Sequence, residues 1–339
     1  MPELYGKHYT PDELRRMVGS MAQLAGVRLS ELADGKARGI RVADVYTGGL
    51  RFQVLLDRAM DIGAADFEGK PIAWVHPALG GPDQYEPEGY GWSRTWGGGL
   101  VTTAGLTFFG QPEEDAGETL GLHGRIAHIP ASKVNVTEEW RGDDYVLEIK
   151  GETRQSALGL ENLLLTRKIS TKLGSRSLTI EDTVRNDGFI PTPHMILYHC
   201  NFGFPVVSPD SVLEIDDESV RPRDGRAEKG FATHTKFDEP DPGFPEQVFF
   251  HKPRIDSEGF SKAAIINRKL NYGAYIRYRA AELPYMAQWK LMDAGNYVCA
   301  LEPANQWETP RKTLREEGRL RFLQPGEEVN YLVEIGVVG

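Results

Sequence analysis

Short apolar runs separated by glycine and proline are the feature that most limits how this chain can fold. From Val27 onward such runs recur, as in Gly39-Ile-Arg-Val-Ala-Asp-Val45 and Gly49-Leu-Arg-Phe-Gln-Val-Leu-Leu56. Runs of this length with turn residues between them are typical of antiparallel strands. The chain has no β-α-β rhythm, no Gly-x-Gly-x-x-Gly after a strand and no Gly-Lys-Ser/Thr loop, which disfavours a doubly wound nucleotide-binding fold. The pattern predicts an all-β protein.

Strand-like segments continue to the C-terminus, with two interruptions of a different character. Further strands are expected at Lys70–Val75, Tyr145–Lys150, Leu163–Lys172, Ser177–Arg185, Met195–Phe202, Val212–Ile215, Ala263–Asn267, Tyr272–Arg279, Tyr297–Glu302 and Glu328–Val338. Residues 77–99 have no clear period and indicate a long functional loop. The polar, proline-rich segment 221–253 is expected to be a surface insertion.

One long helix is expected near the N-terminus, at residues 10–25. Thr10 can cap it, Pro11 suits its first turn and Glu13 completes a capping box. An apolar stripe follows and ends at Gly26. We expect this helix to pack on the outside of the β structure.

The composition is that of an ordinary globular protein with an acidic balance. Of 339 residues, 40% are apolar and 26% are charged, and 39 basic against 49 acidic side chains give a formal charge of −10. Such a surface repels phosphate backbones and anionic lipid, so neither nucleic acid nor a membrane is expected as a partner. Residues 1–30 contain no apolar signal segment, and the cysteines, Cys200 and Cys299, suit a reducing compartment. We expect a cytoplasmic protein.

The segment His194–Pro205 combines a strand pattern with polar side chains at two alternate positions. With the period of a strand, His199 and Asn201 share one face. The opposite face would hold Ile196, Tyr198, Cys200 and Phe202. Polar groups at the end of an apolar strand need partners or a function, so this pair is either a satisfied core histidine with its neighbour or part of a site.

Two other places combine reactive side chains with a backbone that can bend. In Leu120-Gly-Leu-His-Gly-Arg125, glycines on both sides of Leu122 and His123 leave room for a ligand. Its structural alternative is a glycine-framed turn with a solvated arginine. In Tyr297–Asn305, an apolar strand ends on Glu302 just before Pro303 breaks its ladder. A carboxylate at such a position is normally paired or functional, because burying it alone is costly.

In their order along the chain, these motifs resemble the aldose 1-epimerase (galactose mutarotase-like) superfamily. The similar elements are Leu122-His123-Gly124, His199-Cys-Asn201-Phe202 and Glu302-Pro-Ala-Asn305-Gln306. The segments Trp92–Gly99, which contains Arg94, and His123-Gly-Arg125 are also similar to elements of the hexose-phosphate mutarotase branch. Asp57–Gly63, Gly98–Gly105 and Leu120–Arg125 are most similar to a relatively uncharacterised branch, a domain of unknown function. The resemblance implies one domain over residues 1–339, a large sandwich of two antiparallel sheets with a sugar site on a concave sheet face.

The resemblance also implies an activity and a role for each of these residues. In the family, a glutamate takes the proton of the anomeric hydroxyl while a histidine protonates the ring oxygen, so the ring opens, turns about C1–C2 and closes on its other face. Glu302 would be the base and His199 the acid, facing each other across a gap that a sugar ring fills. Substrate-binding candidates are His123, Arg125, Asn201, Arg94 and Asn305, with Trp92, Trp96, Trp289 and Trp307 as stacking surfaces.

The expected function is a carbohydrate isomerase that interconverts anomers or epimers of a monosaccharide without a cofactor or a resident metal. Two other classes stay open. One is a metal-dependent sugar isomerase in which His123, His199 and Glu302 hold a divalent ion. The other is a non-catalytic carbohydrate-binding protein, which would keep the aromatic platform without needing Glu302 or His199. A homodimer is compatible with the sequence.

Overall fold

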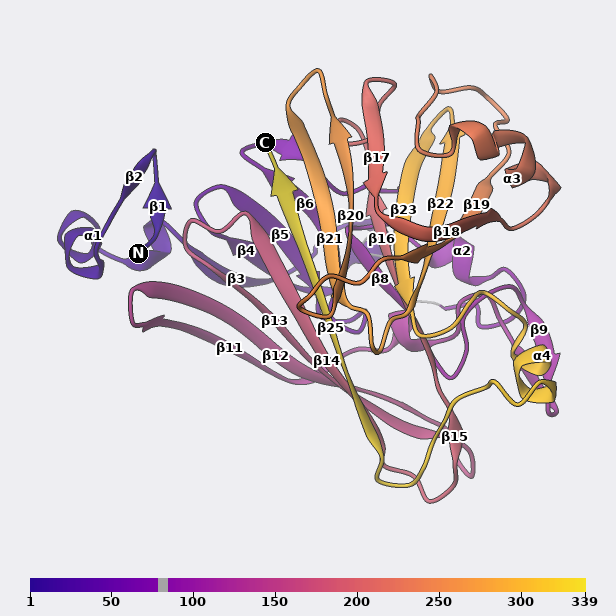
Figure 1. Cartoon of the computed structure of the whole chain (residues 1–339). Coiled ribbons are helices and arrows are strands. Elements are labelled where there is room, and N and C mark those ends of the chain that lie inside the picture. Colours follow the sequence, from indigo (N-terminus) through magenta and orange to yellow (C-terminus); the bar gives the residue numbers. More distant parts are fainter. Residues whose placement is uncertain (79–84) are drawn as a thin grey trace.

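Strands with alternating burial make up most of the protein and assemble into two large sheets (Figure 1). The computed structural model describes residues 1–78 and 85–339. In β14 (Ser177–Asn186), for example, buried and partly exposed side chains alternate along almost the whole strand. This period of two lets a strand bury one face in a core and leave the other near solvent. The expected all-β sandwich of antiparallel sheets is confirmed.

The first large sheet has eight strands, and each neighbouring pair is antiparallel. In spatial order its strands are β11 (Ser132–Arg141), β12 (Asp144–Ser156), β13 (Asn162–Lys172), β14, β25 (Glu328–Val338), β21 (Tyr272–Arg279), β20 (Phe260–Asn267) and β17 (Ser211–Ile215). Strands far apart in sequence therefore become neighbours, because β25 inserts between β14 and β21.

The second large sheet has eleven strands, which also pair antiparallel. In order they are β18 (Asp217–Pro222), β19 (Gln247–Pro253), β22 (Tyr285–Asp293), β23 (Asn296–Ala304), β16 (Met195–Phe202), β8 (Val101–Leu106), β6 (Asp61–Phe67), β5 (Leu50–Leu55), β4 (Arg41–Tyr46) and β3 (Gly26–Glu31), with β7 (Lys70–Pro71) beside β6. The strands β16 and β23, which carry two of the three motifs, lie side by side near the centre of this sheet.

Besides the two large sheets, the structure contains short strand pairs and short helices. The small strand pairs are β1 (Glu3–Leu4) with β2 (Lys7–His8), β9 (Glu113–Asp115) with β10 (Glu118–Leu120), and β15 (Thr192–Pro193) with β24 (Phe322–Leu323). The helices are α1 (Pro11–Met17), α2 (Trp92–Thr95), α3 (Gly225–Gly230) and α4 (Arg311–Glu316), and the 3-10 turns are η1 (Met21–Gln23), η2 (Gly35–Ala37), η3 (Ile126–His128) and η4 (Phe231–Thr233). Among the described residues, no helix has the length and apolar character needed to cross a membrane.

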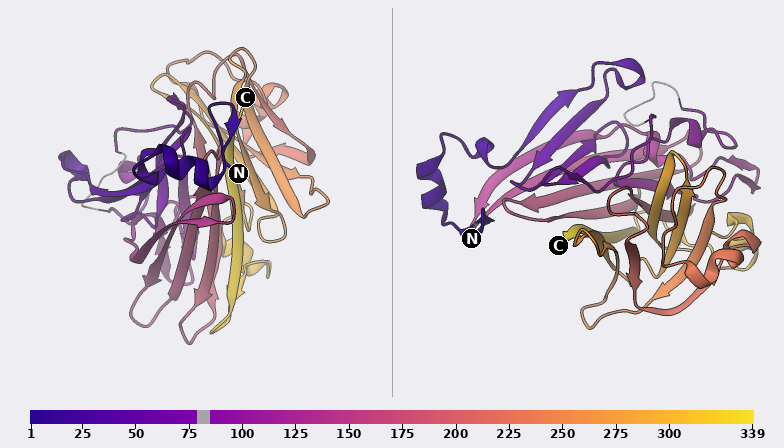
Figure 2. Two further views of the ribbon diagram at one scale, coloured as in Figure 1. Left: turned by 90° about the vertical axis from the view of Figure 1, so that its left-hand side faces the viewer. Right: turned by 90° about the horizontal axis from the view of Figure 1, so that it is seen from above.

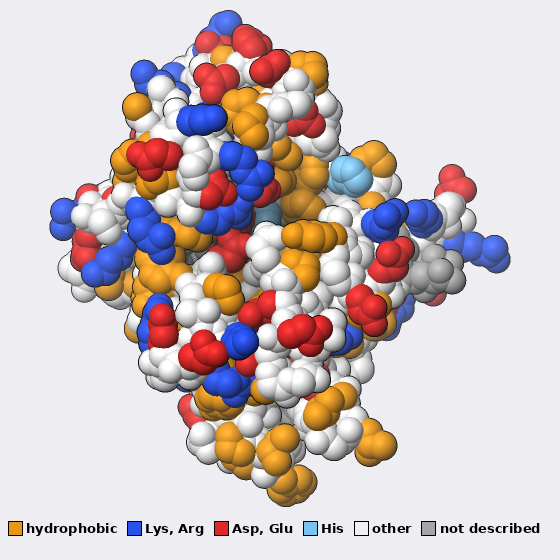
Figure 3. Space-filling view, turned by 90° about the vertical axis from the view of Figure 1, so that its right-hand side faces the viewer, with side chains coloured by type: hydrophobic (Ala, Val, Ile, Leu, Met, Phe, Trp, Pro, Cys, Tyr) orange, Lys and Arg blue, Asp and Glu red, His pale blue; other side chains and the backbone are white. Residues whose placement is uncertain are grey.

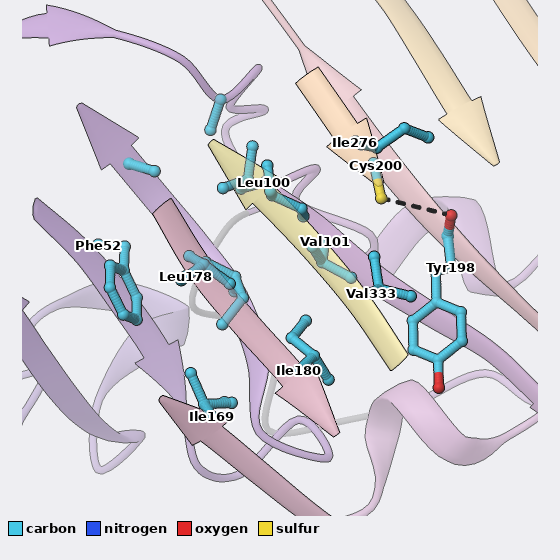
Figure 4. Packing of buried hydrophobic residues seen from close by; sticks show 14 of the residues in the cluster. Phe52, Leu100, Val101, Ile169, Leu178, Ile180, Tyr198, Cys200, Ile276 and Val333 are labelled. Atoms are coloured by element: carbon cyan, nitrogen blue, oxygen red, sulfur yellow. Dashed lines mark hydrogen bonds between the residues drawn. The ribbon is translucent and has the colours of Figure 1, made fainter. Parts of the chain in front are cut away.

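The two sheets pack face to face and enclose the main core. In Figure 2 the early strands form one layer over the strands of residues 132–186. Figure 4 shows core side chains from both sheets, with Tyr198 and Cys200 of β16 near Ile276 of β21 and Val333 of β25. These side chains are almost completely buried. The core therefore fixes one face of β16 and leaves its other face for different contacts.

The predicted helix at residues 10–25 is only partly present. The cap is as expected, because the Thr10 hydroxyl accepts from the Glu13 amide and the Glu13 carboxylate accepts from the Thr10 amide. The helix α1 nevertheless ends at Met17, since Val18 is extended, and Ser20 then caps the separate turn η1. The apolar stripe thus continued past the real end of the helix.

The segment 221–253 is not simply a surface insertion, which corrects the expectation from the sequence. Its last residues form β19, whose Val248, Phe249 and Phe250 are buried in the eleven-stranded sheet. Its first residues end β18. The predicted loop at 77–99 includes residues 79–84, which lie outside the described residues, and its described part contains α2.

Candidate active site

The central strand β16 presents His199 to a cavity on the face opposite the main core. All residues of β16 are buried, and the strand lies between β23 and β8. Its even-numbered residues, from Ile196 to Phe202, belong to the main core. Met195 and Leu197 belong to a separate apolar cluster, and His199 lines the cavity. The two faces that the sequence predicted for this strand are confirmed.

Glu302 reaches the same cavity from β23, the strand next to β16. The register pairs Cys200 with Leu301, which places Glu302 directly across from His199. His199 Nε2 and Glu302 Oε1 are 3.0 Å apart. The expected gap for a sugar ring between these groups is therefore wrong, because side chains opposite each other on adjacent strands stand too close to admit one. A ligand has to lie against both groups rather than between them.

Asn201 determines which nitrogen of His199 carries a proton. Its Nδ2 donates to the carbonyls of Gly99 at 2.9 Å and His199 at 3.0 Å, which fixes the orientation of the amide. Its Oδ1 then lies 2.5 Å from His199 Nδ1. An amide oxygen only accepts, so Nδ1 is protonated, and in a neutral imidazole Nε2 is the base that faces Glu302. Asn201 is fully buried and does not line the cavity, so it positions His199 instead of binding a hydroxyl.

Burial sets the protonation of the pair. It lowers the pKa of His199 to about 3, with a smaller contribution from nearby His123. It raises the pKa of Glu302 well above 4.5, and the carboxylates of Glu308 and Glu246 act in the same direction. Burial therefore favours the uncharged form of both groups, a protonated Glu302 and a neutral His199. Glu302 Oε1 is buried and makes no hydrogen bond of normal geometry, which leaves it available to a ligand.

His123 enters the cavity from a tight turn between β10 and η3. It has a left-handed φ of 57°, and Gly124 follows with a φ of 74°. A Cβ at Gly124 would lie 2.4 Å from the carbonyl oxygen of Phe108, so the backbones approach too closely for any other residue. The positive φ values confirm the predicted bend, but the space beside Gly124 is filled by the backbone of Phe108 and not left for a ligand. Burial lowers the pKa of His123 to about 4, and its Nδ1 is buried without a hydrogen-bond partner.

Tryptophans surround the two histidines. Trp92 and Trp96, at α2, stack with ring centroids 4.9 Å apart, and Trp92 meets His123 edge-on at 4.8 Å. Trp96 and Trp289 of β22 approach the His199 ring at 5.0 and 5.6 Å. These rings keep water away from the pair and offer apolar faces to a ligand.

A charged cluster forms the remaining wall of the cavity, and sequence reasoning did not identify it. Arg223 Nη2 donates to Glu246 at 2.7 Å, and its Nη1 donates to Glu308 at 3.3 Å. The cavity has a volume of about 390 Å³ and is lined by Tyr90, Trp92, Ser93, Trp96, Gln111, Leu122, His123, His199, Arg223, Arg226, Glu246, Val248, Trp289, Glu302 and Glu308. Figure 3 shows the face with α3 and α4, which is hollowed near its centre and has acidic and basic side chains around the hollow.

Besides Asn201, three residues proposed as substrate ligands lie outside this lining. Arg94 is largely exposed and its Nε is 3.6 Å from Glu86. Asn305 uses its side chain to hold β16, because its Oδ1 accepts from the Ile196 amide at 2.9 Å. Arg125 follows Gly124 as the N-cap residue of η3 and is not among the lining residues. Trp307, a stacking candidate, packs on Tyr285 at 4.4 Å instead.

The alternative of a metal-dependent isomerase needs a set of ligands that converge. In residues 1–78 and 85–339, no group of three or more His, Cys, Asp and Glu side chains is arranged to hold a metal ion. His199 illustrates the reason, because its Nδ1 donates to Asn201 and its Nε2 faces Glu302. The described residues therefore offer no converging ligand set for the metal-dependent alternative.

Comparison with known proteins defines the family of the chain. A family model described as a domain of unknown function, DUF4432, matches residues 37–337. The chain belongs to this family. This agrees with the resemblance found in the motifs of the sequence. None of the curated proteins matches the DUF4432 chain.

Solved structures show that the DUF4432 chain has the galactose mutarotase-like fold. A candidate aldose 1-epimerase from Klebsiella pneumoniae subsp. pneumoniae MGH 78578 is 24% identical, with a TM-score of 0.88 over 97% of this chain and 86% of that one. A galactose mutarotase-like protein from Clostridium acetobutylicum is 14% identical, with a TM-score of 0.64 over 93% and 99% of the two chains. Galactose 1-epimerase from Lactobacillus acidophilus NCFM is 11% identical, with a TM-score of 0.57 over 92% and 98%.

Proposed function

We propose that this DUF4432 protein is an aldose 1-epimerase-like isomerase that interconverts the anomers, or close epimers, of a monosaccharide. The observation that carries the proposal is the pair of His199 and Glu302 on the wall of a cavity lined with tryptophans. Their facing atoms, His199 Nε2 and Glu302 Oε1, are 3.0 Å apart, and both side chains are buried. The shared fold with a candidate aldose 1-epimerase and with a galactose 1-epimerase supports the same activity.

The spacing of the pair suits the two oxygens that exchange protons in mutarotation. The anomeric hydroxyl and the ring oxygen are bonded to the same carbon, C1, so two adjacent protein atoms can contact one each. His199 Nε2 is the base and Glu302 the acid in the resting pair. A sugar that lies on the tryptophans could then touch both groups at once, which is the arrangement that general acid and base catalysis needs.

Each step of the proposed reaction balances within the pair. His199 Nε2 takes the proton of the anomeric hydroxyl, the freed electron pair forms the C1 carbonyl, and the bond from C1 to the ring oxygen breaks as Glu302 protonates that oxygen. After rotation about C1–C2, the imidazolium returns its proton to the carbonyl oxygen while Glu302 takes the proton of the attacking hydroxyl. These roles are the reverse of those that the sequence suggested, because burial favours the protonated form of Glu302 and the neutral form of His199.

The test is anomer exchange, measured by polarimetry or exchange NMR on a panel of freshly dissolved aldoses. Glu302→Gln keeps the shape of the side chain but cannot supply a proton, and His199→Asn removes the base. Each change should lower the rate at least about 10²-fold while sugar binding persists. Binding is followed separately by ligand-observed NMR.

The matched control is Glu148→Gln, which changes a carboxylate on β12 that pairs with Arg141 on the other sheet. This variant should exchange anomers at the wild-type rate. An unchanged rate in Glu302→Gln would contradict the proposed mechanism. A wild-type protein that binds sugars but accelerates no aldose would instead support a carbohydrate-binding role, and activity that a chelator removes and a divalent ion restores would support a metal isomerase.

A further inference from the structure

The arginines on the charged wall of the cavity are ion-paired with carboxylates of the same wall, so their charges are largely neutralised. Arg223, whose side chain is only 18% exposed, is bonded to Glu246 and Glu308, and its Nε also lies 3.4 Å from Asp224. Arg226 lies 3.3 Å from Asp224 and 3.7 Å from Glu246. Two guanidinium groups therefore face three carboxylates.

The carboxylates on this wall keep their charge to different degrees. Burial raises the pKa of Glu246, but hydrogen bonds from Arg223 and Trp289 outweigh it, so the pKa is lowered overall. Burial raises the pKa of Glu308 despite the nearby guanidinium. Glu246 is consequently an anion at neutral pH, and it accepts a hydrogen bond from Arg223, which lines the same cavity.

The basic residues that could have bound an anion elsewhere in the site are not in it. Arg94 and Arg125 belong to the segments that are similar to the hexose-phosphate mutarotase branch, and neither lines the cavity. His123 and His199 are neutral at neutral pH, because burial lowers the pKa of both. Among the lining residues that the structure describes, every guanidinium is thus matched by a carboxylate.

We propose that this wall restricts the site to uncharged sugars and rejects those that carry a phosphate, sulfate or carboxylate group, with Glu246 and Glu308 as the specificity-determining residues. The inference rests on the proposed function and names its substrate class. An anion at Arg223 would displace a partly buried carboxylate and meet its like charge. Sugar hydroxyls, in contrast, can donate to Glu246 and Glu308 and accept from Arg223 without breaking the ion pairs.

The first experiment compares matched ligands on the wild-type protein. Ligand-observed NMR titrations give dissociation constants for D-glucose and D-galactose, their 6-phosphates, their uronates and inorganic phosphate. The free sugars should bind at least about tenfold more tightly than their charged counterparts, a difference of about 1.4 kcal/mol. Inorganic phosphate should not bind. Tighter binding of a 6-phosphate or a uronate than of its free sugar would overturn the inference.

The second experiment removes the rejecting charges. The double variant Glu246→Gln with Glu308→Gln keeps hydrogen-bonding shape but leaves Arg223 without an anionic partner in the cavity, so affinity for inorganic phosphate and the 6-phosphates should rise at least about tenfold. Glu148→Gln, beside Arg141 on the other sheet, should gain nothing. If the double variant does not fold, the two single variants are measured instead.

The outcomes separate the selectivity from the activity. Exclusion of phosphate by the wild type and its capture by the variants would support the selectivity even if no aldose is turned over, in which case only the proposed activity fails. No gain of anion binding in folded variants would overturn the selectivity, whatever the rate of anomer exchange.

Discussion

Asn201 shows how one side chain can fix the tautomer of a neighbouring histidine. It lies two residues from His199 on β16, and both of its amide hydrogens go to backbone carbonyls. Only its oxygen is left for His199 Nδ1. The imidazole is therefore held in the tautomer whose Nε2 lone pair points at Glu302. Residue-level control of this kind needs no contact between Asn201 and a substrate.

Nitrogen NMR of histidine-labelled protein tests this assignment. In the wild type, His199 should show one protonated nitrogen, Nδ1, and one unprotonated nitrogen, Nε2, between about pH 5 and about pH 8. Asn201→Asp places a carboxylate against Nδ1, so it should favour the imidazolium and protonate both nitrogens. The control is Asn305→Asp, whose side chain contacts the backbone of β16 rather than His199. Two protonated nitrogens in the wild type would refute the assignment.

At the residue scale, the sequence predicted the groups that sit at strand ends or in glycine-framed turns. His123, His199 and Glu302 line one cavity, as the resemblance implied, whereas the pairing register that places Glu302 beside His199 was not predicted. The ion-paired wall is different. Arg223 and Glu246 are 23 positions apart in a charged segment that looks like any solvated surface. The segment reaches the cavity because β18 and β19, the strands on either side of it, pair in the eleven-stranded sheet.

Among the elements, the short helix α4 is fixed to the strand pair β9 and β10 by buried charges. Arg311, 2% exposed, donates to Asp115 at 2.6 Å and to Glu118 at 2.7 Å. Arg315 also donates to Asp115. Glu308 lies just before α4, so this anchor holds one end of the charged wall in place.

Removal of the Arg311 side chain should lower the stability of the fold. Arg311→Met leaves Asp115 buried with fewer partners, so we expect the free energy of unfolding to fall by about 3–5 kcal/mol. Arg319→Met is the control, because Arg319 pairs with Glu317 on the surface and such pairs contribute about 0–1 kcal/mol. Urea unfolding monitored by circular dichroism measures both. A loss of equal size in the two variants would mean that burial of the Arg311 pair is unimportant.

The strands differ in how well the sequence predicted them. The strands β16, β21 and β25 have the predicted bounds, because each is an uninterrupted apolar or alternating run. The strand β11 was not predicted, since most of its side chains are exposed and its sequence is polar. It forms because β12 offers a neighbouring edge, a tertiary cause that local propensity does not contain.

At the scale of the whole molecule, a buried ionic network joins the two sheets behind the site. Arg167 of β13 donates to Asp182 of β14 and to Asp61 of β6. The Tyr198 hydroxyl of β16 donates to the same Asp182 at 2.7 Å. The strand that carries His199 is thereby tied to the opposite sheet. The sequence predicted the two-layer fold, but not this link, because Arg167 and Asp61 are 106 positions apart and their pairing leaves no local signal.

Buried histidines make the stability of the whole fold sensitive to acid. Burial lowers the pKa of His123 to about 4, of His128 to about 2, and of His194 and His199 to about 3. In the unfolded chain these groups titrate near 6.5. Below that pH the unfolded state binds more protons than the folded state. Glu302 acts in the opposite direction above pH 4.5, because burial raises its pKa and keeps it protonated in the folded state.

We therefore expect the free energy of unfolding to fall as the pH drops from about 6.5 to about 4, by up to about 1.4 kcal/mol per pH unit for each buried histidine. His194 is the residue to test, since it lies outside the cavity lining and contacts Tyr331 and the Leu106 carbonyl. In His194→Gln the free energy of unfolding should depend less steeply on pH, because unfolding then takes up about one proton fewer. Urea unfolding at a series of pH values measures it, with the wild type as reference. A slope that is unchanged in the variant, or a wild-type stability that rises toward pH 4, would contradict the expected neutral state of these histidines.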